Sequence, residues 1–572
     1  MSQKRLKKIR KIQQEVESVK VVSIPEGEKL NIIRTIKENW IFLVLITVAI
    51  VAVFANGMNA AFVSDDYATI LNNPDITKWS YAFQGGASTY FINSMVAKMF
   101  GVVPLPFHLN SLFLYLITCY LAFVFIYHLF GRGVAWISLS LFAVHPMHVE
   151  AVTWISGKPY LLIAMYVLLS MIWFIKFIET ENIWYLMGTF LSFVMGFLTD
   201  NPRPFSLFLI MPLYMWLKGV DIRRNKWWKY WPLTLIPIAI ITVIVWPHIM
   251  MRVGVVNAGV NASDSLFYNP FFQYPTGVAK YLQLLWAPID LTLYHTMYVF
   301  PVWLNWAILL MYLTLIGYFS WKDKRYAFAL IFIFAAILPS MMPVKVSWLV
   351  AERYAYLGSL GFCLFLALIL HEISTKVKWV AGGLMVVILV LSSVRLMLRN
   401  IDWTTNHKLW VNTCQVSPNS HNAWNNIGDD YDKLKQYDNA IKGFSQSTVI
   451  KPNYADAFHN RANIFFKMGR NDLARQSYNT ALYYNPGLYQ TYLSLINIDL
   501  IERDLDSALN HAKTALQVNP NDPTTQYILA VVLSQRNENQ QAIDVLERLV
   551  RAYPGYRQAQ EALVQLKGMI KK

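Results

Sequence analysis

For its length, this sequence has very few cysteines and few charged residues. Only three cysteines occur in 572 residues: Cys119 and Cys363 lie in apolar runs, and Cys414 stands alone. This spacing excludes a disulfide framework and a CxxC metal site. Charged residues make up 15% of the chain, hydrophobic residues 55%, and the mean hydropathy is +0.34. Such a composition is too apolar for an ordinary soluble protein and predicts a membrane protein with many spans.

Acidic residues are scarcer than basic ones, 34 against 50, which gives a formal net charge of +16. In a soluble protein this excess would suggest nucleic-acid binding, but here membrane topology explains much of it, so no nucleic-acid partner is expected. Near the N-terminus, ahead of the first apolar run, lies a cluster of basic residues: Lys4, Arg5, Lys7, Lys8, Arg10 and Lys11. Such a cluster predicts that residues 1–38 are a cytoplasmic segment ahead of a retained signal anchor.

Apolar runs long enough to cross a bilayer fill residues 39–400. We predict about eleven spans, at 40–63, 107–130, 134–152, 159–178, 182–198, 204–218, 230–250, 301–321, 326–343, 354–371 and 378–398. The basic loops fit a cytoplasmic N-terminus, and an odd number of spans then places the C-terminal domain outside the cytoplasm. Residues 276–293 are also apolar, but Lys280, Pro288 and Asp290 favour a surface-lying or re-entrant helix over a span that would reverse this topology.

The C-terminal part, residues 401–572, is polar and repetitive. Prolines recur every 34 residues, at Pro418, Pro452, Pro486, Pro520 and Pro554. The first unit carries further marks at fixed positions, namely Trp424, Ile427, Gly428, Tyr431, Ala440 and Phe444. A period of 34 residues with these marks is typical of tetratricopeptide repeats, which pair two helices per unit and stack into a solenoid with a concave binding face.

Charged side chains gather at the ends of the predicted spans. Because a charge at the edge of the membrane is energetically costly, each cluster is a candidate functional site. Asp65 and Asp66 follow the first span, and the structural alternative there is a solvated boundary with a helix N-cap. A second cluster, within residues 145–162, contains His145, His148, Glu150 and Lys158. Its HxxH spacing lacks a third zinc ligand, so hydrogen-bonding histidines are the alternative to a metal site.

Two later segments add further charges. "TDNPRPF", residues 199–205, holds Asp200 and Arg203 between prolines, where the structural alternative is a kinked turn. Residues 345–362 hold Lys345, Glu352, Arg353 and Tyr354 at the mouth of a span. Arg353 could simply pair with a nearby acid, for which Glu352 is a candidate. Acids in the first loop and bases in later loops favour a functional site over separate structural ion pairs.

Three stretches, "SDDYATILNNP", "HPMHVEAVTWISGK" and "AERYAYLGSLGF", followed by the repeats, resemble the transmembrane and tetratricopeptide repeat containing (TMTC) protein O-mannosyltransferases and their prokaryotic relatives. The resemblance runs from the first span to the last repeat. It implies an all-α fold, with a GT-C-like membrane domain ahead of the solenoid. Two departures concern the donor phosphate site: Lys158 stands where relatives often have Arg, and "LTDNPRP" replaces a more usual Lys-Pro stretch.

The resemblance also implies an active site at Asp65 and Asp66, facing a polyprenyl-phosphate-linked sugar at the membrane edge. A serine or threonine hydroxyl needs a general base, which one of the two acids would supply, with inversion at the anomeric carbon. The phosphate leaves already ionised and needs positive charge, for which Arg353 is the first candidate and Lys158 and Arg203 are further ones. No cofactor is certain, and a divalent cation between the acids stays open.

The remaining active-site candidates are His145, His148, Glu150, Glu352 and Tyr354. The repeats would capture an extended or unfolded acceptor protein on the active-site side of the membrane, either the plasma membrane of a prokaryote or the endoplasmic reticulum. The main rival function is a non-catalytic membrane scaffold whose repeats recruit extracytoplasmic partners. A transporter is disfavoured because the charges lie at the ends of spans rather than at their centres.

Overall fold

The fold is seen in a computed structural model that describes residues 29–83, 87–199, 201–220, 269–296, 300–341 and 348–570. Within these ranges the secondary structure is helical, with no β-strand. The chain forms two compact units, Met1–Asn412 and Thr413–Lys572, and the division falls inside α17 (Asn406–Val416). The predicted all-α class, apolar helices followed by a helical repeat, is confirmed.

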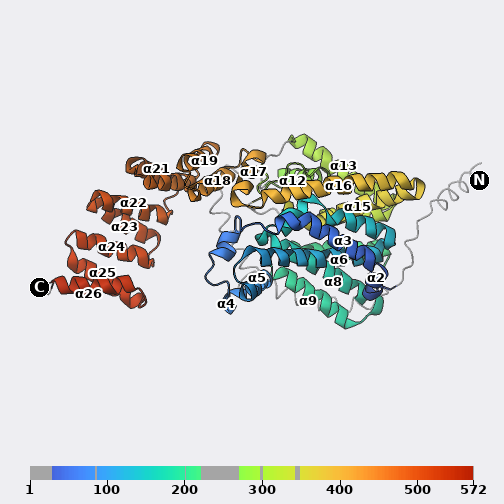
Figure 1. The fold of residues 1–572 in the computed structure, drawn as a ribbon, viewed down its shortest axis with the longest axis horizontal. Helices are drawn as coiled ribbons and strands as arrows, with labels where there is room; N and C mark the ends of the chain where they lie inside the picture. The colour runs from blue at the N-terminus through green and yellow to red at the C-terminus, as the bar shows by residue number, and fades with distance from the viewer. Residues whose placement is uncertain are drawn as a thin grey trace, which may run out of the picture. The chain divides into compact units, whose positions relative to one another are not determined.

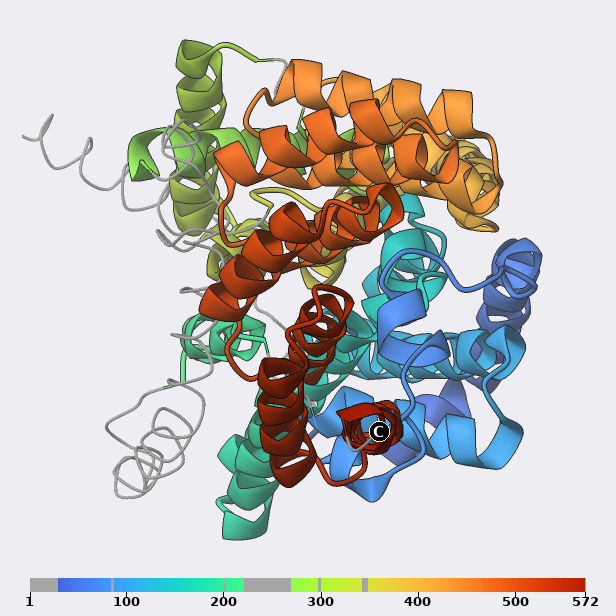
Figure 2. The ribbon, with the colours of Figure 1, turned by 90° about the vertical axis from the view of Figure 1, so that its left-hand side faces the viewer.

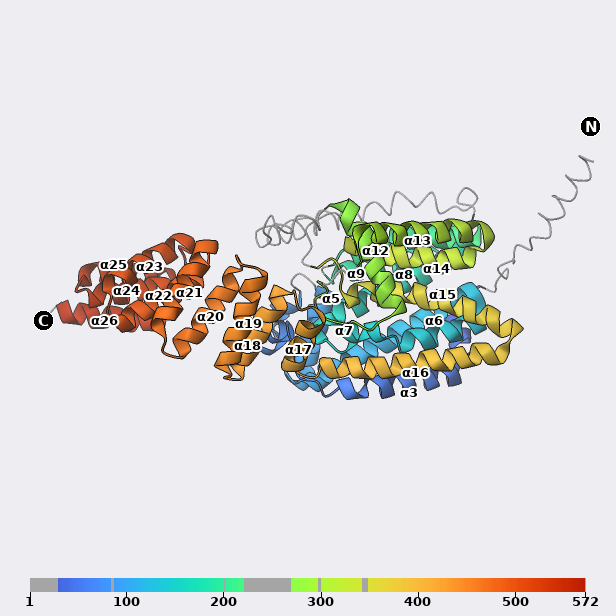
Figure 3. The ribbon, with the colours of Figure 1, turned by 90° about the horizontal axis from the view of Figure 1, so that it is seen from above.

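The first unit is a bundle of long helices that run side by side (Figures 1 and 3). In the described part of the chain, seven helices are long and apolar enough to cross a membrane, which confirms an integral membrane protein. These are α3 (Trp40–Phe54) with η1 (Ala55–Gly57), α6 (Pro104–Ala143), η4 (Ile155–Gly157) with α8 (Lys158–Thr180), α13 (Val302–Lys322), α14 (Lys324–Ile337) with η8 (Leu338–Met341), η9 (Glu352–Ala355) with α15 (Tyr356–Lys376), and α16 (Lys378–Asp402).

The other elements of this unit are shorter. They are α2 (Ile32–Glu38), η2 (Tyr67–Leu71), α4 (Trp79–Ala82), α5 (Ala87–Phe100), η3 (Pro146–His148), α7 (Val149–Val152), α9 (Ile183–Phe197), η5 (Arg203–Ser206), α10 (Leu207–Lys218) and α12 (Pro270–Trp286). At 1.5 Å per residue, α9 and α10 fall short of a hydrocarbon core of about 30 Å, although spans were predicted there. The predicted span at 230–250 lies outside the described residues.

Helix α6 accounts for two predicted spans, because it folds back on itself. Gly131 has φ 81°, a left-handed conformation that suits glycine and interrupts the helix. The Tyr115 hydroxyl donates to the carbonyl oxygens of Phe142 and Ala143, both at 3.1 Å, which a straight helix would place about 40 Å away. The second arm ends at Ala143, so the predicted span at 134–152 is partly replaced by the short elements η3 and α7. Pro146 lacks the N–H that a continuing helix would need.

The amphipathic segment at 276–293 forms the end of α12 and the stretch after it. Helix α12 has 17 residues and is not among the seven candidate spans. It ends at Trp286, two residues before Pro288, because the residue before a proline avoids the helical conformation.

The second unit stacks helix pairs, whose succession from orange to dark red can be followed in Figure 2. The helices are α18 (His421–Lys433), α19 (Tyr437–Ile450), α20 (Ala455–Lys467), α21 (Asn471–Tyr484), α22 (Tyr489–Glu502), α23 (Leu505–Val518), α24 (Pro523–Gln535), α25 (Asn539–Ala552) and α26 (Arg557–Ile570). Each of the five repeating prolines stands two residues beyond the end of a helix. Alanines at the 34-residue period, Ala440, Ala474, Ala508 and Ala542, are fully buried between helices.

Candidate active site

Loops from distant parts of the sequence meet at the end of the bundle where α5 and α7 lie (Figure 3). Asp66, after α3, bonds Ser156 in the turn before α8. Glu150 of α7 bonds Arg353 of η9, 203 residues away. Arg203 of η5 stacks on Tyr354 of η9. The structure therefore joins the four sequence segments singled out above, as far as they are described; Asp200 and Lys345 lie outside the described residues.

Asp66 is fully buried and ties two of these loops together. Its Oδ1 accepts from the backbone N–H of Ser156 at 2.9 Å and from the Ser156 hydroxyl at 2.5 Å, and its Oδ2 accepts from the Val63 N–H at 3.1 Å. Burial raises the pKa of Asp66 to about 6, although these hydrogen bonds favour the ionised form. With both oxygens already occupied, Asp66 is placed to fix the geometry of the loop.

Asp65 has the opposite environment, because its side chain is exposed. Protein atoms still surround the carboxyl on several sides, and this partial desolvation raises its pKa. The positive charge of Arg353 acts in the other direction and lowers it. Of the two adjacent acids, Asp65 is therefore the one that an incoming molecule can reach, and it lies within the electrostatic reach of a cation.

Arg353 forms a buried ion pair with Glu150. Its guanidinium Nη1 donates to Glu150 Oε1, and its backbone N–H donates to Glu150 Oε2 at 2.8 Å. Burial raises the pKa of Glu150, and the charge of Arg353 opposes that rise. The guanidinium also lies 4.9 Å from the ring centre of Tyr354, and its Nε donates to the Tyr160 hydroxyl at 3.4 Å. Most of the charge of Arg353 is thus already compensated by Glu150.

The nearby acid Glu352, named above as a candidate partner of Arg353, instead pairs with another arginine. Its Oε1 accepts from Arg399 Nη2 at 3.0 Å and lies 3.6 Å from His295 Nε2, and Glu352 and Arg399 are fully buried. Adjacent residues of the 3-10 turn η9 point in different directions, so neighbours in sequence acquire different partners. Arg399 lies near the end of the apolar helix α16, and the energetic cost of a charged side chain there could have marked it as a candidate site residue.

Arg203 is a cation with no carboxylate partner among the described residues. Its guanidinium lies 3.9 Å from the ring centre of Tyr354 and 4.9 Å from that of Tyr160. Its Nε donates to the Ser340 hydroxyl at 3.0 Å, and its Nη1 donates to Asn201 Oδ1 at 2.8 Å. The side chain is partly exposed, so its charge remains available to an anion.

Lys158 is fully buried at the start of α8. Its ammonium donates to Asn93 Oδ1 of α5 at 2.6 Å and lies 5.4 Å from the ring centre of Phe107. The turn before it depends on Gly157, where a methyl group would stand 2.3 Å from the carbonyl oxygen of Glu150. This close approach explains why the last position of "WISG" requires glycine, the residue without a side chain.

The two histidines hold helices together. His148 Nδ1 lies 2.8 Å from the Tyr115 hydroxyl of α6, and its Nε2 lies 2.7 Å from the Ser359 hydroxyl of α15. His145 Nε2 lies 3.3 Å from the carbonyl oxygen of Leu285. Burial lowers the pKa of His145 to about 4 and that of His148 well below its usual value, so both rings are neutral. No group of three or more His, Cys, Asp or Glu side chains within the described ranges could hold a metal ion.

Three further residues, which carry no charge to mark them in the sequence, complete the site. Ser156 positions Asp66, Tyr160 contacts both Arg203 and Arg353, and Ser340 bonds Arg203. Ser156 and Tyr160 lie within the segment "HPMHVEAVTWISGKPYLL", but uncharged side chains in an apolar context gave no signal of their own.

Comparisons with known proteins match both units. Models described as a tetratricopeptide repeat match residues 455–487 and 499–566, and one described as a TPR repeat matches 428–469. Protein O-mannosyl-transferase TMTC3 of Homo sapiens is 24% identical over 476 residues, 72% of this chain and 51% of the relative. Protein O-mannosyl-transferase TMTC4 of Mus musculus is 24% identical over 461 residues, 66% of this chain and 62% of the relative.

Among solved structures, the MamA protein covers 26% of this chain and 80% of its own, with 13% identity and a TM-score of 0.24. The chain spans about half the length of the TMTC3 relatives it matches. The resemblance predicted from the sequence motifs is confirmed: this chain, with its apolar helices and tetratricopeptide repeats, resembles the TMTC protein O-mannosyl-transferases over about 70% of its length.

Proposed function

We propose that this chain is a membrane glycosyltransferase that moves mannose or another hexose from a polyprenyl-phosphate donor to serine or threonine hydroxyls of extracytoplasmic proteins. One observation carries the proposal. The exposed carboxylate of Asp65 lies within the electrostatic influence of Arg353, which belongs to a cluster of cations and aromatic rings built from distant loops. The names of the relatives support the same reaction class.

In the proposed reaction, Asp65 accepts the proton of the acceptor hydroxyl as its oxygen attacks the anomeric carbon. The bond from that carbon to the phosphate oxygen breaks on the opposite face, so the configuration inverts. The polyprenyl phosphate leaves with the bonding electron pair, and Arg203 stabilises its growing negative charge. Asp66 positions the loop that carries Asp65, and no step of this proposal uses a metal ion.

Arg203 is preferred over Arg353 and Lys158 as the direct phosphate contact. Arg353 is already paired with Glu150, and the Lys158 ammonium is fully buried against Asn93. Arg203 is partly exposed and stacked on tyrosine rings, which fixes the plane of its guanidinium while leaving the charge free to meet phosphate oxygens. Arg353 then contributes a fixed positive field around Asp65.

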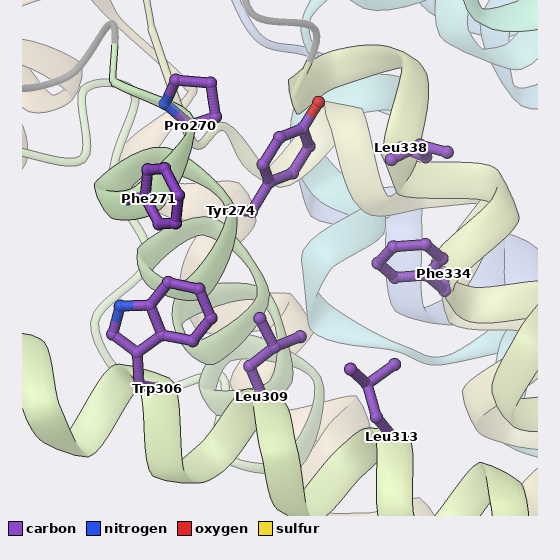
Figure 4. A pocket seen from close by; sticks show the side chains of 8 residues that line it. All are labelled: Pro270, Phe271, Tyr274, Trp306, Leu309, Leu313, Phe334 and Leu338. Atoms are coloured by element: carbon purple, nitrogen blue, oxygen red, sulfur yellow. The ribbon is translucent and has the colours of Figure 1, made fainter.

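The hydrocarbon part of the donor needs an apolar site near Arg203. A cavity of about 390 Å³ lies between α12, α13 and α14, as Figure 4 shows. Its lining includes Phe271, Trp306, Leu309, Leu313, Phe334 and Leu338. Leu338 begins the short turn η8, which also holds Ser340, the hydrogen-bond partner of Arg203. A phosphate on Arg203 with its hydrocarbon chain in this cavity matches a lipid-linked donor.

The test of the function is direct. The purified chain is incubated with a panel of polyprenyl-phosphate sugars and peptides of secreted proteins, and glycopeptides are identified by mass spectrometry. We expect sugar on serine or threonine with inverted anomeric configuration. If no donor supports transfer while peptides still bind the repeats, the scaffold function replaces the enzyme.

The cavity makes a separate prediction. Leu313→Trp should fill part of it, and losing contact with even two methylene groups should raise the KM for a long-chain donor about tenfold. A donor with only two isoprene units fills less of the cavity and should be affected less. Leu310→Trp is the matched control, because residue 310 is exposed on the same helix and does not line the cavity. If both variants affected both donors equally, the hydrocarbon chain of the donor would have to bind outside this cavity.

A further inference from the structure

The chain turns sharply just before the two adjacent acids. Ser64 has φ 52°, a left-handed conformation in which the Cβ of an ordinary residue crowds the following carbonyl oxygen. Strained residues of this kind persist only where their surroundings hold them, and they gather at functional sites. Directly after the turn the two acids diverge, since the Asp65 side chain is exposed and the Asp66 side chain is fully buried. The conformation of Ser64 therefore helps to decide where each acid points.

The turn is held by the segment that follows α16, the last candidate span. Asn406, the first residue of α17, accepts a hydrogen bond through its Oδ1 from the backbone N–H of Ser64 at 2.9 Å. Earlier in the same loop, the N–H of Ala61 donates to the carbonyl oxygen of Thr404 at 3.0 Å. Asn406 and Ser64 are 342 residues apart in the chain, so this support exists only in the assembled bundle.

The turn between α16 and α17 is itself rigidly supported. Asn400, near the end of α16, is fully buried. Its Nδ2 donates to the carbonyl oxygen of Val53 at 3.1 Å, and its Oδ1 accepts from the Thr153 hydroxyl at 2.6 Å. Trp403 is also fully buried, and its ring centre lies 5.7 Å from that of Trp154. These contacts fix the turn to α3 and to the loop between α7 and η4.

Backbone contacts hold Asp65 from both sides. On its N-terminal side, Asn406 holds Ser64. On its C-terminal side, the carbonyl oxygen of Asp65 accepts from the Thr69 N–H at 2.9 Å and from the Thr69 hydroxyl at 2.8 Å. Without the bond to Asn406, Ser64 would be free to return to the negative φ that serine prefers. That rotation would redirect the peptide leading into Asp65, and with it the carboxylate.

We propose that Asn406 is a positioning residue, which holds Ser64 in its left-handed conformation and thereby directs the Asp65 carboxylate toward the acceptor hydroxyl. Asn406 acts through the Ser64 backbone and does not itself take part in the reaction. The inference rests on the proposed role of Asp65 as the general base. It places the support of the base in α17, the helix inside which the chain passes from the membrane unit to the repeats.

The first test compares the transfer kinetics of variants of the full chain. Asn406→Ala removes the acceptor of the Ser64 N–H and should lower kcat about 100-fold, the usual effect of misplacing a reacting group by about 1 Å. The KM for the donor should stay within about twofold, because the substitution leaves Arg203 in place. Lys408→Ala is the matched control, since residue 408 is exposed on the same helix. A kcat equal to that of the control would overturn the proposal.

A second variant separates positioning from a general loss of structure. Glycine adopts positive φ about as readily as negative φ, so Ser64→Gly should make the bond to Asn406 less necessary. In the Ser64→Gly background, Asn406→Ala should therefore lower kcat by less than about tenfold. A merely structural role of Asn406 predicts lost stability in both backgrounds and no rescue of kcat. An equal loss of kcat in both backgrounds would contradict an action through Ser64.

A third readout needs no transfer activity. Val63, beside the turn, is 2% exposed and the three native cysteines are buried, so a thiol introduced by Val63→Cys reports the opening of this loop. Asn406→Ala should speed its reaction with a water-soluble maleimide several-fold, whereas Lys408→Ala should not. Faster labelling in a chain that transfers no sugar would support the role of Asn406 in holding the turn and contradict the proposed function instead. Unchanged labelling would contradict the role of Asn406.

Discussion

Asp65→Asn is expected to lower the rate of sugar transfer by about 10²- to 10⁴-fold, the usual contribution of a positioned general base. The amide has nearly the same shape as the carboxylate but cannot accept the proton of the hydroxyl. Because the Asp65 side chain is exposed, the variant should melt at nearly the temperature of the wild type and bind donor normally. Transfer kinetics, donor binding and thermal unfolding of purified protein check the three parts of this expectation.

Asp66→Asn is the matched control, since it makes the same chemical change one residue later in a buried position. Its amide cannot accept all three hydrogen bonds that the carboxylate accepts from Ser156 and Val63, so a buried donor loses its partner at a cost of about 1–3 kcal/mol. This variant should therefore unfold at a lower temperature. If Asp66→Asn were inactive with unchanged stability and Asp65→Asn stayed active, the roles of the two acids would have to be exchanged.

The pH dependence of stability gives a further test of Asp66. The folded-state pKa of Asp66 is about 6, above the value of about 3.9 for an unfolded chain. Between these values the folded state binds the proton more tightly, so the contribution of Asp66 to stability decreases as the pH rises from about 4 to about 6. Asp66→Asn should remove this slope.

The sequence predicts those features that depend on local chemistry. The proline period marks the helix ends of the repeats because proline cannot continue a helix, and apolar length identifies helices that can cross a membrane. The cluster of charges at span ends also appears in the sequence, since each charge there is costly. These features need no knowledge of which segments touch.

The pairing of charges could not be predicted, because it depends on how the bundle closes. Arg353 stands next to Glu352 in sequence but bonds Glu150, 203 residues away, while Glu352 bonds Arg399. The fold-back of α6 at Gly131 brings His148 and Glu150 to their places, and only the assembled helices reveal it. For the same reason the different exposures of Asp65 and Asp66, and hence their proposed roles, are invisible in the sequence.

The pair of Arg353 and Glu150 carries the largest expected effect on stability. Arg353→Gln leaves the buried Glu150 without its cation, and removing one partner of a buried pair typically costs about 3–5 kcal/mol. Glu150→Gln together with Arg353→Gln removes both charges and should recover much of that loss. Denaturant unfolding of the two single variants and the double variant measures this coupling, which strictly additive effects would contradict. Arg557→Gln, which breaks an exposed pair with Glu561 in α26, is the control and should change stability little.

The double variant also tests the electrostatic link to Asp65. Arg353 lowers the pKa of the Asp65 carboxyl against the effect of partial desolvation, so its removal should raise that pKa and keep the base protonated to a higher pH. The acid limb of the profile of kcat/KM against pH should then move to higher pH in the double variant, even though this variant recovers much of the lost stability. An acid limb at the wild-type position would mean that Arg353 acts only through Glu150, as a structural pair that closes the bundle over the site.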